Sequence, residues 1–459
     1  MDHQLPTELV HSLEATKGFD RKEFEEAHYH PTQITSVRFN SAKYDRFAGS
    51  SIINLKFKLN EQVPWCRYGF YLHERPQFTL DPLLHAGAYY VQEASSMFLW
   101  EVLQQHFDEN ANIKVLDLCA APGGKTTLIA SYLKNALIVS NEVIKARANI
   151  LYENVTKSGS ENIVVTNNDA ADFKRLKNYF DLIVVDAPCS GSGLFRKDEN
   201  AISEWSESNV QLCSQRQQRI LADMYSSLKH NGILIYSTCS YSQQVDEDIL
   251  DWLLSNFKFT SNQLQLNNHW NINETVSSKH KAFGYRFWPN KLKGEGFFIA
   301  ALQKNEEDVY SKHNTLNLTP ANNKEVDVCE NYLLKNDWLF YKQHEIIRAV
   351  HKQWNKDIAF LQKNLYLKKA GVQLGEIKGK DLVPHHELAM STIISDNIFK
   401  TELTEEQALQ YLRKKDISLH TDFKGWALYT YKNFPLGWIK ILHNRVNNYY
   451  PTEWRIRKE

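Results

Sequence analysis

The chain has 459 residues, with 54 basic and 54 acidic side chains and a formal net charge of zero. This length allows roughly three domains, and the charge balance excludes a uniformly basic nucleic-acid-binding protein while allowing a local basic face. Six cysteines without a CxxC spacing, the lack of a secretory signal pattern and the lack of a long apolar run predict a cytoplasmic protein that does not enter a membrane.

Residues 1–90 are predicted to form a small N-terminal segment. The stretches "LPTELVHSLEATKG" and "RKEFEEAHYH" are typical of helices, and "ITSVRFN" is typical of a short strand. We therefore expect a mixture of helix and strand ahead of the main domain.

Residues 91–303 alternate short apolar runs with amphipathic stretches. The runs "IKVLDLC", "ALIVSNEV", "NIVVTN", "DLIVVDA" and "GILIYST" have the length of strands buried on both faces of a parallel sheet. Between them, one predicted helix ends at Gly159 and a second ends near Gly232. Their apolar stripes are Ile144, Ala148, Leu151 and Val155 in the first, and Cys213, Ile220, Leu221, Met224 and Leu228 in the second. The stretch "GYRFWPNKLKGEGFFIAALQ" predicts a closing hairpin, so the whole pattern indicates a doubly wound, Rossmann-like α/β domain.

The remainder of the chain is predicted to hold a linker and a C-terminal region. Residues 304–325 are polar and rich in asparagine, which is typical of a linker. Residues 326–459 form the C-terminal region, and its last part, "GWALYTYKNFPLGWIKILHNRVNNYYPTEWRIRKE", predicts a compact β-rich module.

A glycine turn follows the first strand of the predicted sheet, in "VLDLCAAPGGKTT". Gly123 and Gly124 allow the backbone to approach a ligand closely and leave the amides of a helix N-terminus free. A phosphate-binding loop requires a glycine where Cys119 stands, and the dinucleotide pattern GxGxxG is absent. A P-loop nucleotidase is therefore disfavoured.

Two acidic residues follow the next two strands. Glu142 ends the second strand, where a carboxylate accepts hydrogen bonds from two ribose hydroxyls. Asp169 ends the third strand and suits an adenine amino group, although it equally suits the N-cap of the following helix. A turn followed by these two acids predicts an adenosine without a phosphate chain, and this points to S-adenosylmethionine.

Two cysteines follow the last two parallel strands, Cys189 in "DAPCSGSG" and Cys239 in "STCSYS". Because parallel strands deliver their carboxyl ends to one crevice, we expect the two thiols to lie beside the cofactor turn. The spacing does not decide which thiol attacks. Cys213 belongs to the apolar stripe of its helix, and Cys66 and Cys329 carry no functional signal.

The motifs "DLCAAPGGKT", "DAPCSGSG", "STCSYS" and "KGEGFFIAAL" resemble those of the Sun/Nop family of RNA cytosine-C5 methyltransferases. The flanking "TSVRFN" and "YYVQEASSM" are similar to that family, and "LGEIKGKDLVPHHELAMS" with the final β-rich stretch resembles its bacterial small-subunit rRNA branch, which has a PUA-like tail. Asn290 and "QQVDEDIL" depart from the family pattern outside its core chemistry.

This resemblance implies an S-adenosylmethionine-dependent methyltransferase domain between an N-terminal RNA-binding segment and a C-terminal RNA-binding region. It implies Cys239 as the nucleophile and Cys189 as the thiol that assists release of the enzyme–RNA adduct, with Asp186 and Lys125 supporting the reaction. No metal site is expected. The expected cofactor-binding residues are Cys119, Ala120, Ala121, Pro122, Gly123, Gly124, Lys125, Glu142, Asp169 and Asp186.

Residues 425–459 interleave six basic residues with eight aromatic ones, a composition that suits RNA contact. Arg455, Arg457 and Lys458 are predicted phosphate contacts, although most of the aromatic residues are expected in a small core. The resemblance adds Arg38 as a further RNA contact. A cytosine in paired RNA would have to be unstacked to reach the crevice.

The sequence therefore predicts a monomeric RNA 5-methylcytosine transferase that acts on small-subunit (16S) rRNA and not on DNA. Transfer RNA is the alternative substrate. A catalytically idle, RNA-binding ribosome assembly factor is the alternative of a different class, and the two intact thiols and two cofactor acids argue against it.

Overall fold

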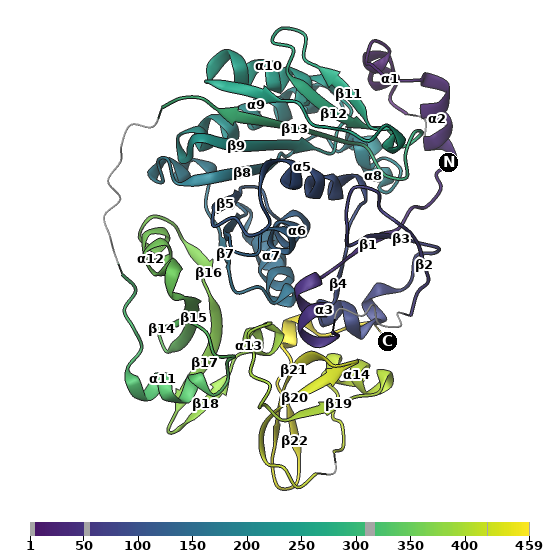
Figure 1. The fold of residues 1–459 in the computed structure, drawn as a ribbon. Coiled ribbons are helices and arrows are strands. Elements are labelled where there is room, and N and C mark those ends of the chain that lie inside the picture. Colours follow the sequence, from purple (N-terminus) through teal and green to yellow (C-terminus); the bar gives the residue numbers. More distant parts are fainter. Residues whose placement is uncertain (1–4, 50–55, 308–316, 420, 459) are drawn as a thin grey trace.

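The computed structural model describes residues 5–49, 56–307, 317–419 and 421–458, and Figure 1 shows their arrangement. A ten-stranded sheet lies at the centre, in the order β11-β12-β13-β9-β8-β5-β6-β7-β16, with β10 paired to β13. Its parallel strands are β5 (Lys114–Asp117), β6 (Leu137–Asn141), β7 (Ile163–Thr166), β8 (Phe180–Asp186) and β9 (Leu228–Thr238). Its antiparallel strands are β10 (Phe259–Asn262), β11 (Asn273–Val276), β12 (Phe283–Phe287), β13 (Phe297–Lys304) and β16 (Leu367–Lys369). The predicted α/β, Rossmann-like fold is confirmed.

Helices cover both faces of the central sheet, because its apolar strands must be buried on both sides. One face packs against α5 (Leu99–His106), α6 (Gly124–Tyr132) and α7 (Lys145–Ser158). The other packs against α9 (Glu207–Met224), α10 (Glu247–Asn256) and α12 (Asn355–Asn364). The short α8 (Glu199–Glu204) precedes α9. As predicted, α7 ends at Gly159, which has a φ of +80°, and β12 and β13 form the closing hairpin.

The second predicted helix is shorter than its apolar stripe suggested. The helix α9 ends at Met224, and Leu228 is already the first residue of β9. Leu228 belongs to the same apolar cluster as Met224, so its spacing imitated a further helical turn. The strand continues through Gly232, where the sequence had predicted the end of a helix.

The C-terminal region contributes directly to the central sheet. The strand β16 pairs antiparallel with β7, and α12 covers the sheet beside α9 and α10. The sequence did not predict this contribution, because a three-residue edge strand has no periodicity to detect. The predicted linker lies partly outside the described residues (308–316), and its last residues begin α11 (Asn323–Glu330), which opens with a capping box.

The other C-terminal elements form two four-stranded sheets. The first contains β14 (Trp338–Gln343), β15 (Ile346–His351), β17 (Val372–Lys378) and β18 (Asp381–Pro384), and α13 (His386–Met390) follows it. The second contains β19 (Lys400–Glu402), β20 (Gly425–Tyr431), β21 (Phe434–Ile441) and β22 (Val446–Asn448), with α14 (Glu405–Leu412) packed on it. The last sheet and the tail after it are the β-rich part that the sequence predicted.

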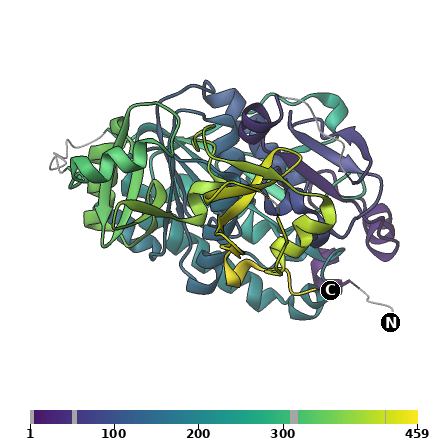
Figure 2. The same ribbon diagram turned by 90° about the horizontal axis from the view of Figure 1, so that it is seen from below.

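The N-terminal segment forms a four-stranded sheet of its own, in the order β2-β3-β1-β4. Its apolar residues share one cluster with those of the last sheet, so the two ends of the chain pack together. In the view from below, the yellow β19–β22 sheet lies between the purple N-terminal elements and the green β14–β18 sheet (Figure 2). The N-terminal elements are α1 (Thr7–Leu13), α2 (Arg21–Tyr29), β1 (Ser36–Phe39), α3 (Ser41–Phe47), β2 (Leu59–Gln62), β3 (Gly69–Leu72), α4 (Pro82–His85) and β4 (Tyr89–Val91).

A buried ion pair ties the edge strand β16 to α13. The ammonium Nζ of Lys369 lies 2.6 Å from Oε1 of Glu387, and the two side chains are only 1% and 2% exposed. Lys369 also donates a hydrogen bond to the carbonyl of Gly371 at 2.8 Å. Since neither charge can reach water, each depends on the other for compensation.

We predict that Lys369→Met lowers the free energy of unfolding by about 3–5 kcal/mol, because it leaves the carboxylate of Glu387 buried without its partner. The measurement is urea unfolding at neutral pH. Lys352→Met is the matched control, because the Lys352–Asp337 pair is 57% and 60% exposed and should change stability by less than about 1 kcal/mol. Equal, small losses in both variants would show that the buried pair is not a stabilising link.

Candidate active site

The carboxyl ends of the parallel strands bring the predicted site residues to one edge of the sheet. Asp186 is the last residue of β8, Glu142 follows β6, and Cys239 follows β9. The pairing of β8 with β9 sets Asp186 opposite Ser237. The loops after these two strands therefore start side by side.

The two thiols meet where these loops cross. The sulfurs Sγ of Cys189 and Cys239 lie 3.1 Å apart, and both residues are partly accessible. The hydrogen bond shared with Cys239, together with burial, raises the pKa of the Cys189 thiol well above its ordinary value. Cys189 therefore holds its proton and can donate it toward the sulfur of Cys239.

Close backbone packing holds the two loops together. The amide of Gly193 donates to the carbonyl of Cys239 at 2.9 Å, and the amide of Gly296 donates to the carbonyl of Gly193 at 3.2 Å. A Cβ atom on Gly193 would lie only 2.4 Å from the carbonyl oxygen of Gly296. This position has no room for a side chain, so packing requires the second glycine of "CSGSG", Gly193.

Lys125 and Asp186 form an ion pair beside the thiols. The ammonium Nζ of Lys125 lies 2.8 Å from Oδ2 of Asp186 and 5.2 Å from the ring centre of Phe297. The hydroxyl of Ser237 donates to Oδ1 of Asp186 at 2.8 Å. The charge of Lys125 is thus placed against Asp186, and it fixes the orientation of that carboxylate.

A buried ionic network supports the loop of Cys239, and the sequence reading did not predict it. Thr238 donates from Oγ1 to Oδ1 of Asp246 at 2.6 Å, and Arg286 forms ion pairs with both Asp246 and Glu247. Arg286 also donates to the carbonyl of Tyr241 at 2.8 Å. Two acidic residues of "QQVDEDIL", Asp246 and Glu247, are therefore structural partners of Arg286. The position of these acidic residues shortly after Cys239 was the feature of the sequence that could have indicated this network.

The cofactor turn is held from behind by α7. Gly123 has a φ of +114°, which favours glycine, and α6 begins at Gly124. Arg147 donates to the carbonyl of Ala121 at 2.8 Å, and Asn154 donates to the carbonyl of Pro122 at 2.8 Å. Two side chains of one helix thus fix the backbone of the turn.

A cavity of about 200 Å³ opens in front of this turn. Its lining includes the predicted Cys119, Ala120, Ala121, Pro122, Gly124, Lys125 and Asp186. It also includes Asp117, which the sequence reading missed although an acid at the end of the first strand was visible. Thr126 donates to Oδ2 of Asp117 at 2.6 Å, while the buried Oδ1 has no hydrogen-bond partner among the described residues. An unpaired carboxylate oxygen in an acidic cavity fits a ligand that is cationic, such as a sulfonium or an ammonium group.

Glu142 and Asp169 occupy different environments. Glu142 is buried; its Oε1 accepts from the amide of Ile144 at 2.9 Å and its Oε2 lies 3.3 Å from Arg147. Asp169 is 41% exposed and accepts from the amide of Ala171 at 3.0 Å, so its alternative role as an N-cap is present. That hydrogen bond and the charge of Arg219 lower the pKa of Asp169. Its contact with adenine stays a prediction.

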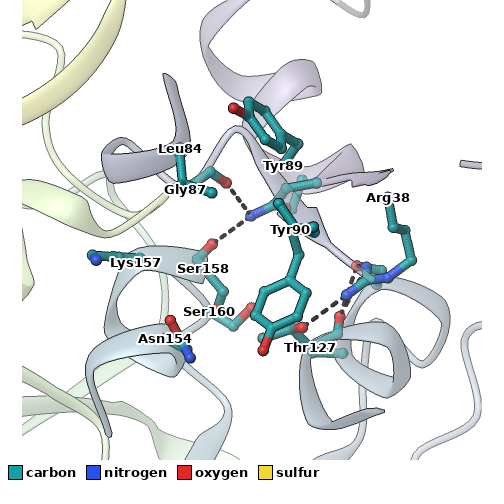
Figure 3. A pocket seen from close by; sticks show the side chains of 15 residues that line it. Arg38, Leu84, Gly87, Tyr89, Tyr90, Thr127, Asn154, Lys157, Ser158 and Ser160 are labelled. Atoms are coloured by element: carbon teal, nitrogen blue, oxygen red, sulfur yellow. Dashed lines mark hydrogen bonds between the residues drawn. The ribbon is translucent and has the colours of Figure 1, made fainter. Parts of the chain in front are cut away.

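Arg38 is not placed for surface contact with RNA. It is 2% exposed, and its guanidinium donates to Gln92 at 2.8 Å, to Thr127 at 2.7 Å and to Ser131 at 3.0 Å. Figure 3 shows Arg38 reaching from the N-terminal sheet toward Thr127 on α6. Arg38 links the N-terminal segment to the helix that follows the cofactor turn, and its contact with RNA stays a prediction.

A second cavity, of about 260 Å³, lies between the N-terminal sheet and helices α6 and α7 (Figure 3). Tyr90 lines both this cavity and the cavity in front of the turn, so its ring stands between them. Asn40 donates to the carbonyls of Gly87 at 3.0 Å and Ser158 at 2.8 Å, which closes one wall.

The predicted phosphate contacts in the tail are exposed. Arg455, Arg457 and Lys458 all lie on the surface, whereas most aromatic residues of the last module are buried in a small core. The three buried cysteines Cys66, Cys213 and Cys329 pack in apolar clusters and are not part of the thiol pair. The search for membrane-spanning segments, limited to the described residues, found no helix with the length and apolar character to cross a bilayer.

Three family models match separate parts of the chain. Residues 103–303 match a model described as 16S rRNA methyltransferase RsmB/F. Residues 5–94 match the N-terminal domain of 16S rRNA methyltransferase RsmF, and residues 399–456 match the RsmF PUA domain. The predicted resemblance is thus confirmed.

Similar proteins cover almost the whole chain. A "Ribosomal RNA small subunit methyltransferase F" from Psychromonas ingrahamii is 32% identical over 91% of this chain and 90% of its own length. A protein of the same name from Shewanella loihica is 29% identical over 91% of this chain and 88% of its own length.

Solved structures share the central fold. A methyltransferase homolog from Pyrococcus horikoshii is 27% identical, with a TM-score of 0.51 over 65% of this chain and all of its own length. NSun6 from the same organism, crystallised with SFG, is 18% identical, with a TM-score of 0.53 over 66% of this chain and 99% of its own.

The cavity geometry predicts a pH-dependent stability. Burial raises the pKa of Asp117 to about 7, although the hydrogen bond from Thr126 opposes this shift. The carboxyl of an unfolded chain ionises near pH ~3.9. The folded protein keeps this proton to a higher pH than the unfolded chain does. As the pH rises from about 4 to about 7, Asp117 therefore lowers the free energy of unfolding, by about 4 kcal/mol in total. Above about pH 7 its contribution does not change further.

We therefore expect Asp117→Asn to become more stable relative to the unaltered protein as the pH rises through that window, and the difference to be constant above it. Urea unfolding at a series of pH values measures this difference. Asp416→Asn, which changes an exposed carboxyl, is the control and should show no such slope. A pH-independent difference for Asp117→Asn would contradict the assigned burial of its charge.

Proposed function

Because the chain belongs to the RsmB/F family of 16S rRNA methyltransferases, we propose that it transfers a methyl group from S-adenosylmethionine to carbon 5 of a cytosine in small-subunit rRNA. One observation carries the reaction type: two thiols lie 3.1 Å apart on the loops that follow β8 and β9, and β8 ends in Asp186, which lines the cavity of the cofactor turn. A binding protein without catalysis has no need for such a pair.

The residues of the cavity suit the cofactor. Glu142, which follows β6 and is not among the residues that line this cavity, is the proposed acceptor for the ribose hydroxyls, and the turn at Gly123 allows close approach of the backbone. Asp117 and Asp186 add negative charge where a sulfonium or an ammonium group is favoured. When bound, S-adenosylmethionine supplies an electrophilic methyl group.

Cys239 activates the cytosine by addition. Carbon 5 of cytosine is a weak nucleophile, but a thiolate that adds to carbon 6 converts the ring into an enamine. Asp186, which is oriented by Lys125 and Ser237, is placed to hydrogen-bond the N3/N4 edge of the base as the bond forms. Carbon 5 of the enamine then takes up the methyl group and loses its proton to water. The electrons of that C–H bond re-form the carbon 5–carbon 6 double bond, the carbon–sulfur bond breaks, and its electron pair returns to the sulfur of Cys239.

Cys189 assists this release. Its thiol holds a proton at 3.1 Å from the sulfur of Cys239, so it stabilises the negative charge that returns to that sulfur. The assignment of Cys239 as the nucleophile follows the resemblance, since the geometry is nearly symmetric in the two sulfurs.

The names of the relatives support rRNA over tRNA as the substrate. The PUA match and the exposed basic tail support RNA capture by the C-terminal end of the chain, with Arg455, Arg457 and Lys458 as its phosphate contacts. We also propose that the protein acts as a monomer in the cytoplasm.

We expect bisulfite sequencing of total RNA to show at least one 16S rRNA cytosine that is protected in cells with the gene and converted in cells without it. Reintroducing the gene should restore protection, whereas the Cys239→Ala gene should not. Protection confined to tRNA would replace the proposed substrate, and unchanged conversion of all RNA would reject the activity.

The two thiols can be separated by their single variants. Cys239→Ala cannot form the enamine, so neither methyl transfer nor a covalent RNA adduct should occur. Cys189→Ala should still add to the base and transfer the methyl group, and then accumulate as a protein–RNA species on a denaturing gel.

The gel should be run with the unaltered enzyme and with Cys213→Ala as a matched control, because Cys213 is a buried thiol outside the pair. An adduct in Cys239→Ala and none in Cys189→Ala would exchange the two roles. Full activity in both variants would end the covalent mechanism.

A further inference from the structure

The C-terminal region places an aromatic ring at the rim of the cofactor site. Tyr366 directly precedes β16, which pairs with β7. Its carbonyl accepts from the amide of Asn167 at 3.3 Å and from the side chain of Asn168 at 3.0 Å, and its amide donates to Oδ1 of Asn168 at 3.0 Å. Asn168 is adjacent to Asp169, so three hydrogen bonds fix Tyr366 beside the predicted adenine contact.

The ring of Tyr366 faces solvent although its backbone is held rigidly. The residue is 65% exposed, the highest fraction given for a large hydrophobic residue in the described part of the chain. No ring or cation of the described residues stacks on it. An aromatic side chain that is fixed but uncovered is preorganised for a stacking partner, because little freedom is lost when the partner binds.

Two lysines lie near this rim in the fold. Lys368 is two residues after Tyr366, in the middle of the edge strand β16. Its ammonium lies 5.7 Å from the ring centre of Tyr152 on α7, and Lys145 is the first residue of that helix. Lys145 and Tyr152 are seven residues apart on α7, so they lie on one face of that helix, and Lys368 approaches this face. Burial, together with the charge of Lys145, lowers the pKa of Lys368.

Neither lysine forms an ion pair with a carboxylate anywhere in residues 5–49, 56–307, 317–419 and 421–458. Lys145 also stands in the first turn of α7, where the helix dipole repels a cation, and that turn contains no acidic residue. Arg147, in the same turn, is satisfied by Glu142. Two like charges without a carboxylate partner among the described residues leave a place for an anion.

We infer that Tyr366, Lys368 and Lys145 form a binding surface for single-stranded RNA, on which a base near the target cytosine stacks on the ring and its phosphate binds the two ammonium groups. This inference rests on the proposed RNA substrate. An unpaired strand offers both a flat base and a phosphate within one nucleotide, which matches one ring and two cations. From β9 to β16 the sheet has five inter-strand spacings, about 24 Å in all, so this base lies a few nucleotides from the one at Cys239.

The experiment compares RNA affinity and S-adenosylmethionine affinity in the full chain. An in vitro 16S rRNA transcript is the RNA probe, and filter binding is measured between about 50 and 200 mM KCl. Tyr366→Ala should weaken RNA binding about tenfold, whereas Tyr366→Phe, which keeps the ring, should bind as the unaltered protein does. Lys145→Gln/Lys368→Gln should flatten the log–log salt slope by about 1.4, or about 0.7 for each lost contact.

Lys279→Gln/Lys281→Gln is the matched control, since it removes the same charge from the turn between β11 and β12, at the opposite edge of the sheet. Its affinity and slope should not change. Calorimetry with S-adenosylmethionine should give the same affinity for every variant.

Three results would overturn the inference. The first is unchanged RNA binding in Tyr366→Ala, and the second is an equal loss of RNA affinity in the control pair. The third is a loss of cofactor affinity in place of RNA affinity, which would mean that Tyr366 covers the adenine. A failed proposed function is seen separately, because the unaltered enzyme would then transfer no methyl group to the transcript while the binding differences persisted.

Discussion

The parallel pairing of β8 with β9 is the constraint on which the site depends. It sets Asp186 opposite Ser237, and the chain needs only a few further residues on each strand to reach Cys189 and Cys239. The glycine contact between the two loops, at Gly193 and Gly296, then removes the remaining freedom. Strand register and backbone packing therefore set the 3.1 Å separation of the sulfurs, and no disulfide bond joins them.

The need to fix the loop of Cys239 also explains why so many charges are buried behind the thiols. Arg286, Asp246 and Glu247 are paired with one another, and their hydrogen bonds end on Thr238 and the carbonyl of Tyr241, on either side of Cys239. Isolated charges at this depth would be strongly unfavourable, whereas a satisfied network rigidifies the backbone that it touches. The loop that carries Cys239 thus has little freedom to move, which suits the proposed role of that sulfur as a nucleophile.

The C-terminal region is part of the catalytic architecture and not merely attached to it. Its strand β16 extends the central sheet, its helix α12 covers one face, and its residue Tyr366 is bonded to the loop that precedes Asp169. On the other side, Arg38 and Asn40 connect the N-terminal segment to α6 and α7. Elements from three regions of the chain therefore hold α7, the helix that fixes the cofactor turn.

The sequence by itself determined the five strands of the parallel core and the glycine turn after the first of them, and it located Glu142 and the two cysteines after later strands, because each is encoded in a short stretch: a buried apolar run followed by a polar residue at its carboxyl end. Only the tertiary structure decided the rest, since it depends on contacts between distant stretches. It buried Arg38, which looked like a surface cation, it made Asp117 a strongly perturbed acid, and it ended α9 at Met224 although Leu228 fitted the stripe. It also joined β16 to β7 across just over two hundred residues, and no local pattern in three residues can specify such a partner.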